Sequence, residues 1–262
     1  RVLGTIILII AIICFGWSAF SLGKYAWQTW TTQKNLDNLA DKVNNDTISI
    51  PDTDKESGES EDPVSESEAM MEKYGELYKE NKDFIGWLSV EGTKINYPVM
   101  YTPNDPEYYL RKNFDGDYDI GGMLFVDARC TFNPTSTDTI IYGHHMNNGT
   151  MFGPLMDFQD NDYLKKHTTI TFDTMYRPGT YKIFASFQSK AYDPDSEEFK
   201  YYDFINAETS YDFEEYLNNI KNLSLYYDEE NAPSFGDEII TLSTCDYYTT
   251  DGRFAVLAKR IK

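Results

Sequence analysis

Cysteine and basic residues are scarce in this sequence of 262 residues. The chain has three Cys, and 23 Lys and Arg stand against 43 Asp and Glu. So few cysteines, in an odd number, exclude the disulfide framework that holds many small secreted domains together. The chain also has only three His and no Cys-x-x-Cys or His-x-x-x-His spacing. We therefore expect no metal site and no cofactor.

The deficit of basic charge also bears on partners. The formal net charge is −20, and residues 52–68 alone hold eight acids against one Lys. Nucleic-acid binding needs a basic face that meets phosphates, and binding to anionic lipid headgroups needs a polybasic segment. We expect neither kind of partner.

A long apolar run opens the chain. Residues 2–23 contain no charged side chain. At the rise of an α-helix, 22 residues span roughly 33 Å, which is enough to cross a bilayer core. Trp17, Trp27 and Trp30 lie near the outer end, where indoles favour the membrane interface. We predict a transmembrane signal anchor over residues 1–24, with the rest of the chain outside the cell; a cleaved signal peptide is the alternative.

Composition divides the remainder into two parts. Residues 25–68 are predicted to form a helical stalk followed by an acidic disordered linker, since residues 44–67 are rich in Asp, Glu, Ser and Pro. One folded domain is predicted over residues 69–262, and its 16% aromatic content supplies a core. A helix is expected at its start, over residues 69–81, because apolar residues recur there at helical spacing.

Short β-strands dominate the folded domain. Gly, Pro, Asn and Asp separate them, which is typical of a small barrel or sandwich. The predicted strands cover residues 85–90, 95–100, 121–126, 139–143, 168–172, 181–186, 239–242 and 253–259, with a short helical turn at 108–110. A helix capped by Thr209 or Ser210 lies in a long insertion, residues 192–235. The insertion either packs on the sheet or forms one wall of a binding groove.

The chemistry is concentrated near the C-terminus. Residues 241–245 read Thr-Leu-Ser-Thr-Cys and end a predicted strand, and Arg253 opens the next strand after a turn that contains Asp251 and Gly252. This spacing can hold a thiol and a guanidinium side by side on one rim of a sheet. It favours a nucleophile beside a cation that stabilises an oxyanion. The alternative is a buried Cys that acts as a small hydrophobe.

A Cys nucleophile needs a proton partner, and His144 and His145 directly follow the predicted strand 139–143. Neighbouring residues of a strand point to opposite faces, so only one of the two can face Cys245. His167 lies at a strand entrance and is expected to be solvated. Cys130 and Cys245 can pair in an oxidising compartment, or Cys245 can be a free thiol, which the motifs favour.

These motifs together resemble the sortase family of membrane-anchored cysteine transpeptidases. The resemblance rests on Thr-Leu-Ser-Thr-Cys at 241–245, Arg253, and Tyr-Gly-His at 142–144. The segments that look like class B members are residues 84–88, 92–99, 108–110, 122–127 and 148–153, and the likeness covers residues 72–261. It implies a mainly β fold with added helices (α+β): a closed, sortase-like β-barrel of seven to eight strands with an N-terminal helix and a helix in the insertion before the Cys strand.

The resemblance also assigns roles. It makes Cys245 the nucleophile, His144 the proton donor and acceptor, and Arg253 the cation that stabilises the oxyanion or holds substrate carbonyls. Ser243 and Thr244 are expected to line the path of the substrate, although such residues are also ordinary at a strand end. His145 stands where class B members often have Asn, and Cys130 matches no family motif and is expected to be structural.

The implied function is cleavage of a C-terminal sorting signal of secreted surface proteins after Thr. The acyl group would pass through a Cys245 thioester to an amine of peptidoglycan or to a pilin Lys. One alternative is another cell-wall Cys–His peptidase or an L,D-transpeptidase, which usually has Gly beside the Cys or a Ser-His-Gly-Cys run; here His144 precedes Cys245 by 101 residues. The other is an anchored, non-enzymatic surface domain that binds a partner.

Overall fold

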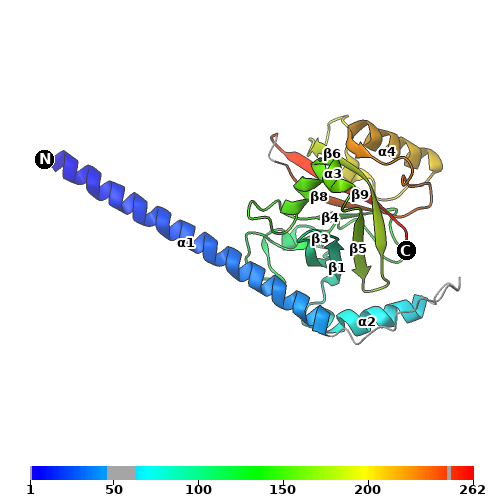
Figure 1. Ribbon diagram of the computed structural model, residues 1–262, viewed down its shortest axis with the longest axis horizontal. Coiled ribbons are helices and arrows are strands. Elements are labelled where there is room, and N and C mark those ends of the chain that lie inside the picture. The colour runs from blue at the N-terminus through cyan, green and yellow to red at the C-terminus, as the bar shows by residue number, and fades with distance from the viewer. Residues whose placement is uncertain (1, 46–62, 247–248) are drawn as a thin grey trace.

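The computed structural model describes residues 2–45, 63–246 and 249–262. It consists of a β-barrel with helices on its outside and a long N-terminal helix that projects away from it (Figure 1). The helices are α1 (Val2–Asn45), α2 (Pro63–Glu80), η1 (Tyr108–Arg111), η2 (Gly153–Gln159), α3 (Asn161–Leu164), η3 (Tyr201–Asp203) and α4 (Ser210–Leu223), the η segments being 3₁₀ helices. The strands are β1 (Phe84–Val90), β2 (Asn96–Met100), β3 (Leu124–Val126), β4 (Asp138–Tyr142), β5 (Thr169–Thr174), β6 (Thr180–Lys190), β7 (Ser224–Tyr227), β8 (Ile239–Cys245) and β9 (Gly252–Arg260).

The strands form one mixed sheet in the order β5-β1-β2-β3-β4-β8-β9-β6-β7. Pairing between β5 and β6 closes eight of these strands into a ring, which confirms the predicted barrel of seven to eight strands. β6 is long enough to pair with β5 over Thr180–Lys182 and with β7 over Ala185–Phe187. β7 therefore lies outside the ring, in a part of the insertion where no strand was predicted.

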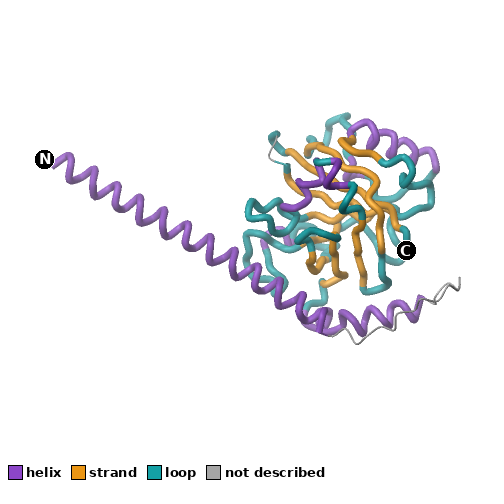
Figure 2. Tube along the Cα trace, in the orientation of Figure 1, coloured by secondary structure: helices purple, strands orange, loops and turns teal. Residues whose placement is uncertain are grey.

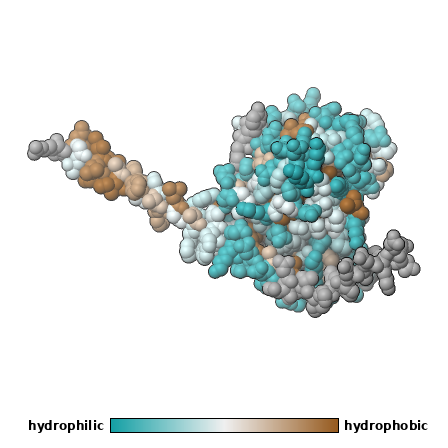
Figure 3. Space-filling model, viewed as in Figure 1, coloured by the Kyte–Doolittle hydropathy of each residue, from teal (hydrophilic) through white to brown (hydrophobic). Residues whose placement is uncertain are grey.

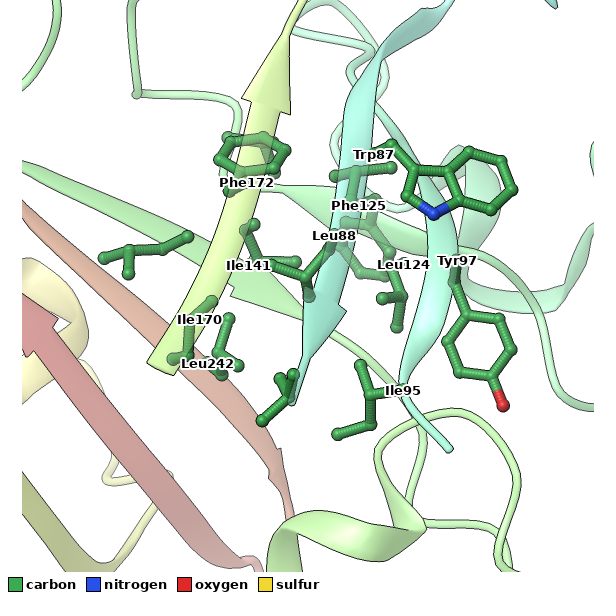
Figure 4. Packing of buried hydrophobic residues seen from close by; sticks show 14 of the residues in the cluster. Trp87, Leu88, Ile95, Tyr97, Leu124, Phe125, Ile141, Ile170, Phe172 and Leu242 are labelled. Atoms are coloured by element: carbon green, nitrogen blue, oxygen red, sulfur yellow. The ribbon is translucent and has the colours of Figure 1, made fainter. Parts of the chain in front are cut away.

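Two apolar clusters hold the barrel together. Side chains from all eight strands of the ring converge in its interior, including the fully buried Leu88, Leu124, Ile141 and Leu242 (Figure 4). A second cluster lies outside the ring, between α4 and the outer faces of β6, β8 and β9; it contains Phe184, Phe187, Phe213, Tyr216, Ile220, Ile239, Ala255 and Leu257. The two clusters together bury β8 over residues 239–244 and β9 over residues 254–258 from both sides.

The predicted helix of the insertion is α4. Thr209 caps it, because its hydroxyl accepts from the N–H of Asp212 while the Asp212 carboxylate accepts from the N–H of Thr209. Its apolar stripe, with Phe213, Tyr216 and Ile220, is buried against the barrel, so α4 itself packs on the sheet (Figure 2). The sequence pattern did not predict η2 and α3, which are too short to show a helical period.

The N-terminal helix α1 runs without interruption from the predicted anchor into the predicted stalk. Its first half is apolar and stands free of the barrel, and α1 is the one helix of the described residues that is long and apolar enough to span a membrane (Figure 3). Its last turns bury Leu36, Leu39 and Val43. Residues 46–62, most of the predicted linker, lie outside the described residues. α2 begins at Pro63, so residues 63–68 are helical rather than disordered, because Pro suits the first helical position and Glu66 the first turn.

Candidate active site

The thiol and the guanidinium predicted to lie together do so. β8 ends at Cys245, β9 begins at Gly252, and the antiparallel ladder pairs Cys245 directly with Arg253. The turn closes through a hydrogen bond from the Asp246 N–H to the Gly252 carbonyl, 2.9 Å. A Cβ atom at Gly252 would lie 2.2 Å from the Asp246 carbonyl oxygen, so only glycine permits this approach.

A cavity of about 370 Å³ opens at this rim. Cys245, His144 and Arg253 all line it, so the structure brings the three predicted residues to one site from β8, from the end of β4 and from β9. Its other walls include Glu107, Leu110, Phe125, Tyr142, Tyr201 and Tyr202. Tyr201 and Tyr202 belong to η3, in the 192–235 insertion. The part of the insertion that forms a wall of the cavity is therefore η3 and not α4.

His144 is held in one orientation by the backbone. Its Nε2 lies 2.8 Å from the carbonyl oxygen of Leu110. Because a carbonyl can only accept, Nε2 carries a proton, and Nδ1 is the nitrogen that can exchange a proton with a ligand. Burial lowers the pKa of His144; the bond to Leu110 opposes this shift and the charge of Arg111 adds to it. Burial therefore favours the neutral form of the ring over the charged form.

The two hydroxyl residues before Cys245, Ser243 and Thr244, are buried and hydrogen-bonded. Thr244 donates to the carbonyl of Gly143, 2.7 Å away, and the Ser243 hydroxyl lies 2.7 Å from that of Tyr201. The first bond joins the residue before Cys245 to the residue before His144. Both side chains border the cavity, so their role toward substrate stays a prediction, while their hydroxyls already serve internal contacts.

Arg253 is only partly buried. Its Nη1 donates to the carbonyls of Gly252, at 3.0 Å, and Asp251, at 3.3 Å. Within the described part of the chain, its other N–H groups have no protein acceptor. They are therefore available to an anion or a carbonyl in the cavity.

The other candidates lie elsewhere. His145 borders a different cavity, together with Lys94 and Tyr163, so within the pair it is His144 that lines the same cavity as Cys245. His167 was expected to be solvated but is half-buried: its Nδ1 lies 3.1 Å from the Glu91 carbonyl and its ring contacts Tyr163. The absence of a side chain at Gly92 makes room for that ring.

Both cysteines of the folded domain are free. Cys130 is fully buried, and burial raises its pKa to about 12, so it is a structural thiol as predicted. Cys245 is half-exposed and borders the cavity. The alternative of a bridge between Cys130 and Cys245 is thereby excluded in this structure.

The contact of His144 with the Leu110 carbonyl was not predicted from the sequence. Residues 108–110 were noted only as a helical turn that resembles class B members, and a backbone acceptor leaves no signal in side-chain patterns. Tyr201 and Tyr202 were also missed, although their place in an aromatic-rich insertion was a hint.

The chain is similar to proteins of one family. A family model described as a sortase domain matches residues 88–261. Sortase B of Listeria monocytogenes is 37% identical over 171 residues, which are 65% of this chain and 66% of that protein. Sortase B of Staphylococcus aureus is 32% identical over 197 residues, which are 74% of this chain and 77% of that protein.

Solved structures agree in fold. A mutant form of Clostridium perfringens sortase B has a TM-score of 0.70 at 27% identity and covers 88% of this chain and 98% of its own. A Staphylococcus aureus sortase B–substrate complex has a TM-score of 0.64 at 30% identity, covering 76% and 92%. A crystal structure of sortase B complexed with triglycine has a TM-score of 0.65 at 29% identity, covering 76% and 93%.

Proposed function

The chain belongs to class B of the sortase family of cysteine transpeptidases, and we propose that it cleaves a C-terminal sorting signal of secreted surface proteins after Thr and transfers the acyl group to a peptidoglycan amine. One observation carries this proposal: Cys245, His144 and Arg253 meet at a single cavity, although 101 residues separate the His from the Cys.

The proposed first half-reaction acylates the enzyme. The Cys245 thiolate attacks the Thr carbonyl carbon, and the Arg253 guanidinium stabilises the oxyanion. The peptide C–N bond breaks as protonated His144 gives its Nδ1 proton to the leaving amine. The products are a thioester on Cys245, a neutral His144 and a released peptide with a free amine.

The second half-reaction reverses the proton movement. The acceptor amine attacks the thioester carbonyl, and neutral His144 takes the surplus proton of that amine at Nδ1. The C–S bond then breaks, a new amide forms, and the thiolate returns. Since the hydrogen bond to Leu110 occupies Nε2, one nitrogen serves both transfers without a ring flip.

The relatives support the proposed partners. One similar structure is a sortase B–substrate complex and another is complexed with triglycine, which fits a peptide donor and a glycine-type amine acceptor. A pilin Lys is the other candidate amine. The apolar half of α1 fits a single-pass membrane anchor that holds the catalytic domain on the outer face of the membrane.

The test uses the full chain in detergent micelles with quenched peptides of the Leu-Pro-x-Thr-Gly and Asn-Pro-x-Thr-Asn types. Triglycine, a Lys side-chain amine and a peptidoglycan fragment serve as acceptors, and mass spectrometry identifies the products. We expect cleavage after Thr, a thioester on Cys245, and transfer to triglycine. Cys245→Ala should abolish both steps.

His144→Ala should lower the rate by at least about 100-fold, and His145→Ala, the matched control on the opposite face, should have little effect. Arg253→Lys keeps the charge but loses the planar fork, so we expect a marked loss. Cleavage that survives Cys245→Ala, or turnover of peptidoglycan fragments without any sorting peptide, would contradict the proposal.

A further inference from the structure

The stalk half of α1 packs on the folded domain through the buried Leu36, Leu39 and Val43, and a polar contact lies near each end of this packing. Near its end, Lys42 forms an ion pair with Glu80 of α2, at 2.6 Å. Three turns earlier, the Thr32 hydroxyl lies within hydrogen-bond distance of two acceptors, the Gln28 carbonyl one turn back in α1, at 3.0 Å, and a carboxylate oxygen of Asp119 in the loop between η1 and β3; Asp119 is the nearer of the two. A cavity of about 220 Å³ borders Thr32 and Asp119, so this hydrogen bond, rather than close packing, joins the two segments at that point.

Asp119 organises the loop to which it belongs. Its second carboxylate oxygen accepts from the N–H of Gly121, at 2.7 Å, and its own N–H donates to the carbonyl of Arg111, at 3.0 Å. The loop lies so close to η1 that a Cβ atom at Gly122 would be 2.5 Å from the Leu110 carbonyl oxygen. Asp119 therefore fixes the loop against the backbone of η1.

The backbone of η1 is also what orients His144. The N–H of Asp119 is bonded to Arg111, and the carbonyl of the preceding residue, Leu110, accepts a hydrogen bond from His144 Nε2. A short chain of contacts thus runs from Thr32 in the stalk through Asp119, Arg111 and Leu110 to the ring. Bonded chains of this kind can carry coupling between sites, and measured coupling decides whether they do.

We propose that Asp119 is a positioning residue for His144, and that the docked stalk helix holds Asp119 in place. The N-terminal helix would then be part of the catalytic unit and not only a tether. This inference rests on the proposed function in one respect, namely that His144 is the residue that moves protons.

The charged and titratable groups around His144 influence the pH at which its ring titrates. Arg111 comes from η1 and Glu107 precedes it, while Cys245 and Arg253 come from the barrel rim. None of them changes in the variants below. The Leu110 carbonyl raises the pKa of His144, so a loosened η1 should lower that pKa further.

The experiment compares variants of the full chain in micelles. Thr32→Val removes the stalk donor. Asp119→Asn leaves one acceptor oxygen for two donors, so it loses one of its bonds. We expect kcat to fall roughly 3- to 30-fold with KM unchanged, as for a small misplacement of a catalytic group. We also expect the His144 ring to titrate at lower pH in NMR spectra of ¹³C-labelled His.

Two controls accompany these variants. Thr32→Ser keeps the hydroxyl and should behave like the wild type. Lys42→Gln breaks the other docking contact without touching Asp119, and should leave kcat and the His144 titration unchanged even where the melting temperature drops.

The inference is overturned if Thr32→Val and Asp119→Asn lower thermal stability but leave both kcat and the His144 titration at wild-type values. In that case the proposed function stands as long as the wild type cleaves its peptide. If no peptide is cleaved by the wild type, the NMR titration still reports whether the stalk and His144 are coupled, so the two failures are distinguishable.

Discussion

The variant Thr244→Val tests whether the Thr244 hydroxyl positions Cys245 relative to His144 or binds substrate. Val has nearly the shape of Thr but cannot donate to the Gly143 carbonyl, so the variant removes one hydrogen bond of 2.7 Å at a site that is 2% exposed. Leaving a partly buried carbonyl without its donor costs about 1–2 kcal/mol. For a domain of this size, the melting temperature should fall by roughly 2–8 °C.

The kinetic consequence separates the two roles. The bond joins the segment that ends in Cys245 to the segment that presents His144, so its loss should misplace one relative to the other. We expect kcat for a quenched sorting peptide to fall about tenfold at an unchanged KM. Thr244→Ser, which keeps the hydroxyl, should retain most of the wild-type rate.

A different outcome would refute this reasoning. If Thr244→Val raises KM while kcat and the melting temperature stay at wild-type values, the hydroxyl binds the sorting signal directly. The internal hydrogen bond would then have no part in holding the catalytic residues.

Three further predictions concern stability and reactivity. Burial raises the pKa of Asp138 to about 7 from 3.8, so between these values the folded chain holds a proton that the unfolded chain has released. The free energy of unfolding should therefore fall as the pH rises from about 4 to about 7. Asp138→Asn should flatten that slope in urea titrations. Gly252→Ala should cost more than about 2 kcal/mol by thermal unfolding and most of the activity, since its Cβ would meet the Asp246 carbonyl; a stable, active variant would contradict this. Iodoacetamide at pH 7.5 should modify Cys245 and leave Cys130 intact in peptide mass spectra, and equal labelling would refute the assignment of Cys130 as structural.

The sequence could predict the part of the site that is formed by two strands consecutive in the chain. Cys245 and Arg253 face each other because a short turn fixes the register of two adjacent strands, and both strands and turn are visible as apolar runs around Asp251 and Gly252. The alternation of a strand likewise required that His144 and His145 face different ways.

Such patterns could not predict which strands far apart in the sequence pair with each other. The parallel pairing of β4 with β8 brings His144 to Cys245, and no periodicity reveals which distant strands are neighbours. The choice of His144 over His145 came from the resemblance to a family. β7, with four residues, is too short to show a period, and the docking of Thr32 on Asp119 left no pattern because it depends on a contact between two polar side chains far apart in the sequence.

The position of β7 outside the closed ring bears on the tendency of the folded chain to aggregate. Among the described strands, it is the one with an open hydrogen-bonding side, because every other strand has neighbours on both sides. An open strand is where two copies of a protein can join by extending a sheet. Here the exposed ladder has four residues, and an ion pair of Lys221 with Glu229 flanks it. This short edge, with charges beside it, therefore offers little template for aggregation through the sheet.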